Sequence, residues 1–155
     1  MAEIERPFST FNFLVELQLP GGQIFCNAEF SECDGLEVTL TPQTIREGGN
    51  NSRPIHLLGP TAYGQLALKR GVTHNIDLWT WFDRVLRRDS RGVRAFGQVV
   101  VLPQNRVRDR GLTFTLSGCL PTKLRMPALN AKDGQIAIEE MNIAYERLQL
   151  VPPQT

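Results

Sequence analysis

Hydrophobic and polar residues alternate along several short stretches of the chain, and this period of two is typical of β-strands with one face in water. Residues 11–17 (FNFLVEL) and 35–41 (GLEVTLT) follow the pattern. Two further apolar stretches, 96–102 (FGQVVVL) and 112–118 (LTFTLSG), flank the charged, turn-rich residues 103–111. These last two stretches predict a β-hairpin with a long polar tip.

One stretch departs from the strand pattern and predicts a helix at about residues 76–88. Gly71 ends the apolar strand LALKR (66–70), and either Thr73 or Asn75 can cap the helix that follows. Acidic residues near its start and arginines near its end also suit the helix dipole.

The expected helix has one apolar face. Leu78, Phe82 and Val85 form a stripe, with Trp79 and Leu86 beside it, and most of the charged residues fall outside it. We therefore predict that Trp79, Phe82 and Leu86 pack into the core, so that one amphipathic helix covers an otherwise β-rich interior.

Residues 134–150 (GQIAIEEMNIAYERLQL) fit two interpretations. The apolar residues before Glu139 and those after Glu140 lie in opposite period-two phases, so a strand needs a bulge near these two glutamates. A helix would instead stack residues 137, 141, 144 and 148 on one face. With either interpretation, the chain of 155 residues predicts a mainly β fold, an antiparallel β-sandwich or barrel with one α-helix, in a single domain spanning residues 1–155.

Charge is nearly balanced overall but unevenly distributed. The 17 basic and 16 acidic residues give a formal net charge of +1, which argues against binding to nucleic acid or membranes through bulk charge. Residues 1–47 hold eight acidic and only two basic residues, and the excess positive charge lies in the rest of the chain. If the fold keeps the two regions apart, this partition favours head-to-tail contact between copies, and a fold that intermingles them is the open alternative.

An arginine-rich stretch carries much of the positive charge. Without interleaved exposed aromatic residues, it favours contact with acidic protein surfaces over nucleic acid. We assign ring-stacking charges within it to Arg106, Arg108 and Arg110. The complete cluster comprises Arg84, Arg87, Arg88, Arg91, Arg94, Arg106, Arg108 and Arg110.

The N-terminal sequence MAEIERPFSTF lacks the basic and apolar segments of a secretory signal, and the longest aliphatic run, 99–102, is too short to cross a bilayer. We therefore expect a chain made in the cytoplasm, without a membrane anchor. Cys26, Cys33 and Cys119 are odd in number and lack CxxC spacing, so we expect buried thiols and neither a disulfide framework nor a zinc site.

Candidate chemistry is sparse. His56 and His74 have no carboxylate or cysteine at metal-ligand spacing. Glu139 and Glu140 are adjacent, so on a strand they face opposite ways and cannot form an acid–base pair by themselves. The glycine-containing residues 46–51 (REGGNN) lack the Lys-Ser/Thr of a phosphate-binding loop. We expect no catalytic residue, metal or cofactor.

Three longer motifs resemble one protein family. They are FSECDGLEVTLTPQTIREGGNN (30–51), LALKRGVTHNIDLWTWF (66–82) and LNAKDGQIAIEEMNIAYERL (129–148). Their order is similar to that in the tail tube proteins of contractile phages and related contractile injection systems. The resemblance runs from about residue 11 to residue 148, nearly the whole chain.

The resemblance implies a structural subunit that assembles as hexameric rings, and these rings stack inside a sheath into a hollow tube that passes cargo or DNA. Two hairpins of each subunit would join neighbouring subunits in a continuous inner β-barrel, which leaves no exposed sheet edge. Implied partners are copies of the chain, sheath subunits, the baseplate and tube-end proteins. The particle would assemble in the cytoplasm of the producing bacterium.

The resemblance also implies roles for individual residues. It favours the bulged strand over the helix for residues 136–148, and Ile45 departs from the family pattern, which has a tyrosine there. The residues that match an extended loop contacting an adjacent subunit or ring are Arg46, Glu47, Gly48, Gly49, Asn50 and Asn51.

Other functions stay open at this point. A paralogous subunit of the same family forms a baseplate-proximal initiator ring or a tube-end ring, and a monomeric adaptor would have the same fold. A different class is a small ligand-binding or hydrolytic β-barrel in which His56, His74 and Glu139 converge.

Overall fold

The computed structural model describes residues 13–46, 48–49, 53–87, 94–102, 111–132 and 134–152. The expected mainly β fold with antiparallel pairing and one helix is confirmed. Its elements in chain order are β1 (Phe13–Gln18), β2 (Ile24–Ala28), β3 (Glu32–Asp34), β4 (Val38–Leu40), β5 (Gln43–Ile45), β6 (Ile55–Leu57), β7 (Thr61–Tyr63), β8 (Gln65–Gly71), α1 (Asp77–Leu86), β9 (Ala95–Val101), β10 (Leu112–Arg125), β11 (Ile138–Ala144) and β12 (Arg147–Val151).

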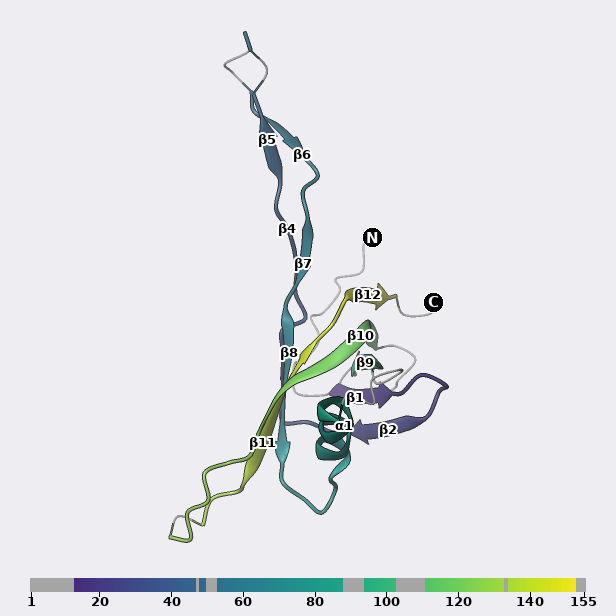
Figure 1. Ribbon diagram of the computed structural model, residues 1–155, viewed down its shortest axis with the longest axis vertical. Helices are drawn as coiled ribbons and strands as arrows, with labels where there is room; N and C mark the ends of the chain where they lie inside the picture. The colour runs from purple at the N-terminus through teal and green to yellow at the C-terminus, as the bar shows by residue number, and fades with distance from the viewer. Residues whose placement is uncertain are drawn as a thin grey trace, which may run out of the picture.

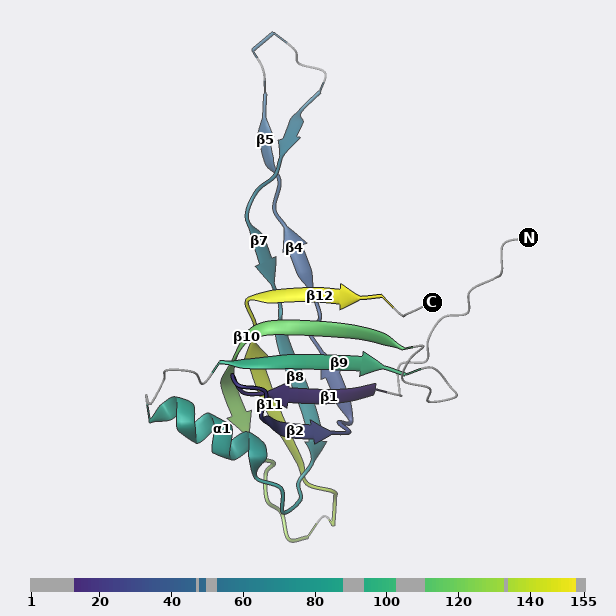
Figure 2. The ribbon, with the colours of Figure 1, turned by 90° about the vertical axis from the view of Figure 1, so that its right-hand side faces the viewer.

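Two layers of strands share the long strand β10. Its first half pairs with β9 and β12, in a layer that also contains β1 and β2. Its second half pairs with β11, in a layer that continues through β8 to β3. Figure 2 shows the strands of the first layer running across those of the second.

The change of layer occurs within β10 at an irregularity. The pairing with β9 shifts between Leu116 and Cys119, and Gly118 has a positive φ of 65°. A bulge with a glycine in the left-handed region bends a strand sharply, and this is how one strand takes part in two crossed sheets. The hairpin predicted from residues 96–102 and 112–118 is therefore confirmed as β9–β10, whereas its tip at 103–110 lies outside the described residues.

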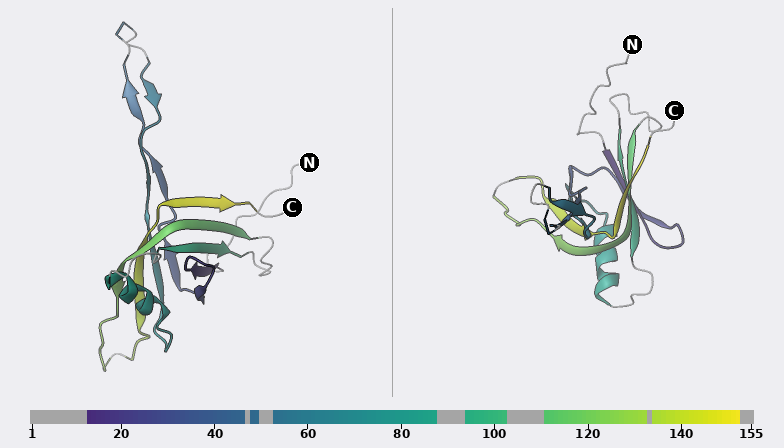
Figure 3. Two further views of the ribbon diagram at one scale, coloured as in Figure 1. Left: turned by 45° about the vertical axis from the view of Figure 1, so that its right-hand side comes forward. Right: turned by 90° about the horizontal axis from the view of Figure 1, so that it is seen from above.

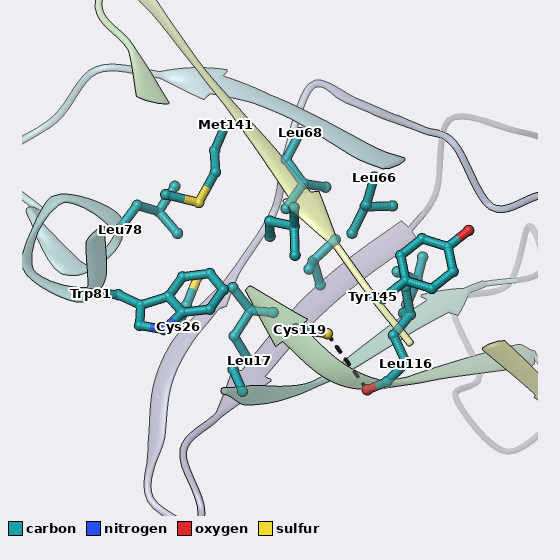
Figure 4. Close-up of a cluster of buried hydrophobic side chains, with 14 of the residues drawn as sticks. Leu17, Cys26, Leu66, Leu68, Leu78, Trp81, Leu116, Cys119, Met141 and Tyr145 are labelled. Atoms are coloured by element: carbon teal, nitrogen blue, oxygen red, sulfur yellow. Dashed lines mark hydrogen bonds between the residues drawn. The ribbon is translucent and has the colours of Figure 1, made fainter. Parts of the chain in front are cut away.

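The core lies between the two layers and α1 (Figure 4). Its members come from the inward positions of alternating strands, as the period of two requires. The most deeply buried side chains are Val15, Leu17, Cys26, Leu66, Leu68, Leu78, Trp81, Val99, Leu116, Cys119, Met141 and Ile143.

The helix prediction is correct in place, and its predicted stripe of Leu78, Phe82 and Val85 packs into or against the core, but two residues assigned to the core are exposed. Leu78 and Trp81 are buried and Phe82 is partly buried, whereas Trp79 is 56% exposed and Leu86 is 65% exposed. Trp79 and Leu86 are seven residues apart and so share one side of the helix, next to the side that Leu78 and Trp81 occupy. Their assignment to the helix core is therefore wrong.

The C-terminal segment is a strand, but the bulge near Glu139 and Glu140 is wrong. The pairing of β11 with β8 is regular from Ile138 to Ala144, and the irregularity lies on β10 between Pro121 and Lys123. The strand keeps one regular alternation of inward and outward residues, because Ile138 points outward and Glu139 takes the inward position. The expected opposite orientation of Glu139 and Glu140 is confirmed.

Candidate assembly interface

A long two-stranded arm extends away from the two layers (Figures 1 and 3). We define it as residues 36–63, which contain β4 paired with β7 and, farther out, β5 paired with β6. The stretch 35–41 was expected to be a strand with one wet face. It does form a strand, with Leu36 packed against the core, but no described residue of the chain buries Val38 and Leu40.

The arm exposes aliphatic side chains along its length. On the outer segment, Ile45 is directly opposite Ile55, and cross-strand partners share one face of a β-ribbon. Isolated two-stranded ribbons are marginally stable, and contiguous exposed apolar residues mark sites of protein contact. The exposed large hydrophobic residues of the arm are Val38, Leu40, Ile45, Ile55, Leu57 and Leu58.

The base of the arm is tied to the body by Tyr145, directly after β11. Its hydroxyl donates a hydrogen bond to the carbonyl of Gly35 (2.7 Å) and accepts one from the amide of Glu37 (3.1 Å). Gly35 has a φ of +96°, and a Cβ at this position would lie 1.8 Å from the carbonyl oxygen of Gln65. Only glycine permits this close approach, which sets where the arm leaves the sheet.

The predicted inter-subunit loop lies at the far end of the arm. Arg46 follows β5 and is exposed, and Gly48 and Gly49 form a turn. Glu47, Asn50 and Asn51 lie outside the described residues, as do the predicted stacking charges Arg106, Arg108 and Arg110. The contact role of both groups stays a prediction.

A buried ionic cluster joins β8, β11 and α1 at the other end of the second layer. Arg70 donates through Nε to Glu139 and through its terminal nitrogens to Asp77, and its guanidinium carbon lies 5.5 Å from the centroid of the Phe30 ring. Arg70 and Glu139 are among the buried residues, and they are directly opposite each other on β8 and β11. One arginine and two carboxylates give the cluster a formal charge of −1.

These contacts strongly favour the charged form of the arginine. Burial alone would lower the pKa of Arg70, but the hydrogen bonds and the charges of Asp77 and Glu139 outweigh it, so the pKa of Arg70 is raised. Removing one partner of such a cluster leaves an uncompensated buried charge. The cluster therefore holds the start of α1 against the sheet.

The cluster was not among the sequence predictions, although the sequence contains a signal for it. In LALKR, Arg70 lies in the same period-two phase as Leu66 and Leu68, and that phase faces the core. A basic residue in a core-facing position requires a buried acidic partner.

The described residues do not assemble the alternative hydrolytic site. His56 is in the arm, His74 is in the loop after β8, and Glu139 is paired with Arg70 (Figure 1). Across the described ranges, His, Cys, Asp and Glu side chains form no group of three or more that could hold a metal ion. In the same part of the chain, no helix has both the length and the apolar character needed to cross a membrane.

Cys26 and Cys119 are buried, as expected, and Cys33 is half-buried. Burial raises the pKa of the Cys26 and Cys119 thiols to about 12. Since the thiolate is the nucleophile, these two cysteines act as small apolar core residues.

Known proteins share this architecture over almost the entire chain. A chain in the cryo-EM structure of the anti-feeding prophage (AFP) baseplate has a TM-score of 0.83 and 29% identity, covering 98% of this chain and 100% of that one. A chain in the extended sheath–tube complex of the PVC extracellular contractile injection system has a TM-score of 0.78 and 18% identity, over 96% and 94%. A chain in the AFP tube-terminating cap has a TM-score of 0.80 and 16% identity, over 98% and 95%.

The two matches below 25% identity show a shared fold. No curated protein sequence matches this chain. The family described as T4-like virus tail tube protein gp19 matches residues 9–149, which include α1, the arm and both layers up to the middle of β12. The chain therefore belongs to the T4-like virus gp19 family of tail tube proteins.

Proposed function

We propose that the protein is a structural subunit of the inner tube of a contractile phage tail or extracellular contractile injection system. The observation that carries this proposal, beside the family, is the arm, whose exposed aliphatic residues are left uncovered by the described part of the chain. A monomeric protein rarely maintains such a surface, whereas a subunit covers it on assembly.

The sheet edges support ring formation. Within the described residues, β2 and β12 end the first layer, and β3 and the second half of β10 bound the second. Open edges pair readily with other strands, and closure of a ring removes them. Six copies would then form one ring, rings would stack into a tube, and the tube would surround a channel for cargo or DNA.

The proposed partners follow from this role. They are further copies of the chain, a surrounding sheath, a baseplate and tube-end proteins, in a particle assembled in the cytoplasm of the producing bacterium. The whole chain would act as one domain in this assembly.

Electron microscopy of the purified protein in negative stain tests the proposal. We expect rings or tubes, and addition of preformed baseplate controls for slow initiation of polymerisation. A population of monomers that persists with the baseplate present would contradict the proposal and would favour a monomeric adaptor.

A second candidate is a baseplate-proximal ring of the same family. The observation in its favour is the 29% identity with a chain of the AFP baseplate, against 18% with the PVC sheath–tube chain and 16% with the AFP cap chain. The same micrographs separate the two roles, because a baseplate ring forms single rings whereas a main tube subunit forms long stacks.

A further inference from the structure

A small apolar groove lies at the start of α1. Figures 1 and 2 show that α1 lies toward the end of the molecule opposite the arm. Its volume is about 310 Å³, far above that needed to hold one water molecule. This is room for a branched aliphatic side chain with part of a longer one. Its lining consists of Val72, Thr73, Asn75, Ile76, Trp79, Met126 and Glu139.

The apolar lining of this groove is not buried by the subunit. Ile76 is 66% exposed, and Val72, Trp79 and Met126 are also exposed. A tryptophan and three aliphatic side chains gathered around one depression form the type of pocket that anchors a partner.

The lining of the groove includes one carboxylate, that of the buried Glu139. Glu139 belongs to the buried cluster with Arg70 and Asp77, whose formal charge is −1. Lys69 and Arg125 are cross-strand partners of Glu140, so they lie on the opposite face of the sheet from Glu139 and do not balance it. His74, the nearest other titratable residue of the loop, is exposed.

The outer segment of the arm has the complementary properties. Ile45 and Ile55 form a directly opposed aliphatic pair, with Arg46 and Arg53 beside them, and all four are exposed. Residues 43–57 contain two arginines and one glutamate, a formal charge of +1. The arm of the same chain extends in the opposite direction from the groove, so it is not the occupant.

We propose that the groove receives the outer segment of the arm of a second copy of this chain, with an isoleucine of the Ile45–Ile55 pair against Trp79 and Ile76 and an arginine near Glu139. This rests on the proposed function, because it identifies the receiving surface for ring stacking. Contact between two different surfaces of one chain is heterologous and extends into an open stack, as a tube requires.

Disulfide trapping between copies tests the contact directly. Ile45→Cys protein is mixed with an equal amount of Ile76→Cys protein under mild oxidation, and the linked species are identified by mass spectrometry. We expect a 45–76 disulfide. The matched control is Ile45→Cys with Leu86→Cys, because Leu86 is equally exposed on the same helix but does not line the groove. Equal linkage to position 86 would overturn the proposal.

Stacking by the variants gives the second measurement. Trp79→Asp should abolish tubes while circular dichroism and single rings remain unchanged, because the side chain is exposed in the subunit. Leu86→Asp should leave tubes intact. Normal tubes from Trp79→Asp, without a 45–76 disulfide, would overturn this inference alone. Wild-type protein that remains monomeric with its baseplate present would instead contradict the proposed function, and this inference with it.

Discussion

Two tryptophans only two positions apart on α1 have opposite environments. Trp81 is buried among the core residues, and its ring centroid lies 5.2 Å from that of Phe25, whereas Trp79 faces outward. A rotation of about 200° between these positions accounts for the difference. The two residues therefore form a natural pair for separating stability from assembly.

Trp81→Ala should reduce the free energy of unfolding by about 3–5 kcal/mol, because it removes a fully buried aromatic side chain and leaves a cavity. Trp79→Ala should change it by about 0.5 kcal/mol or less. Urea denaturation followed by far-ultraviolet circular dichroism measures both. Equal losses for the two variants would contradict the assignment of the buried face.

Tyr145 connects the body to the arm through one hydroxyl group. Tyr145→Phe should cost about 1–3 kcal/mol, since the amide of Glu37 and the carbonyl of Gly35 lose their partner. It should also speed hydrogen exchange at the base of the arm. Tyr63→Phe is the matched control, because this neighbouring hydroxyl makes no hydrogen bond to the described residues. An exchange pattern identical in both variants would show that Tyr145 does not fix the arm.

At the scale of elements, the arm and the body differ in how they are stabilised. Strands β8, β10 and β11 contribute buried residues to the core between the crossed layers, whereas β4, β5 and β6 are exposed throughout. Segments with few buried apolar contacts open most readily. The arm is thus an extension of a separately stabilised body, and its conformation can change without unfolding of that body.

Deletion of residues 48–51 at the tip should leave the melting temperature nearly unchanged and should strongly reduce the length of assembled tubes. The reason is that the deleted residues contribute nothing to the described core but lie where a neighbouring subunit is expected. Scanning calorimetry and electron microscopy measure the two effects. Tubes of normal length would show that the tip is not an inter-subunit contact.

At the scale of the whole molecule, the uneven charge along the chain bears on assembly. The acidic N-terminal third and the arginine-rich stretch 84–110 can attract each other between copies. Exposed pairs contribute only about 0–1 kcal/mol each, but facing opposite charges steer association and set register.

Polymerisation should therefore slow as salt rises toward about 1 M, where the Debye length falls to about 3 Å. Arg106→Glu/Arg108→Glu should slow it further at low salt and flatten the salt dependence. Light scattering follows the rate, with wild-type protein at each salt concentration as the reference. A rate that ignores both the salt and the substitutions would mean that apolar and backbone contacts alone drive stacking.

Local patterns in the sequence were sufficient to predict several elements. Alternation placed β1, the β9–β10 hairpin and β8, and a 3.6-residue period placed α1, because each pattern reflects the geometry of a single element. Family membership also followed from the order of three motifs in the sequence. The alternating pattern of residues 66–70 also places Arg70 on the core-facing side of its strand. The sequence alone did not identify the acidic residues that pair with it.

What covers each face was decided only by the tertiary structure. Residues 35–41 show the same alternating pattern as a core strand, yet they lie on the arm. In the helix, no feature of the local sequence separates the exposed Trp79 and Leu86 from the buried Leu78. Burial depends on which distant strand or subunit supplies the opposing surface, such as Glu139 against Arg70 across 69 positions of sequence. A one-dimensional pattern sets which residues share a face, and long-range packing alone determines what that face contacts.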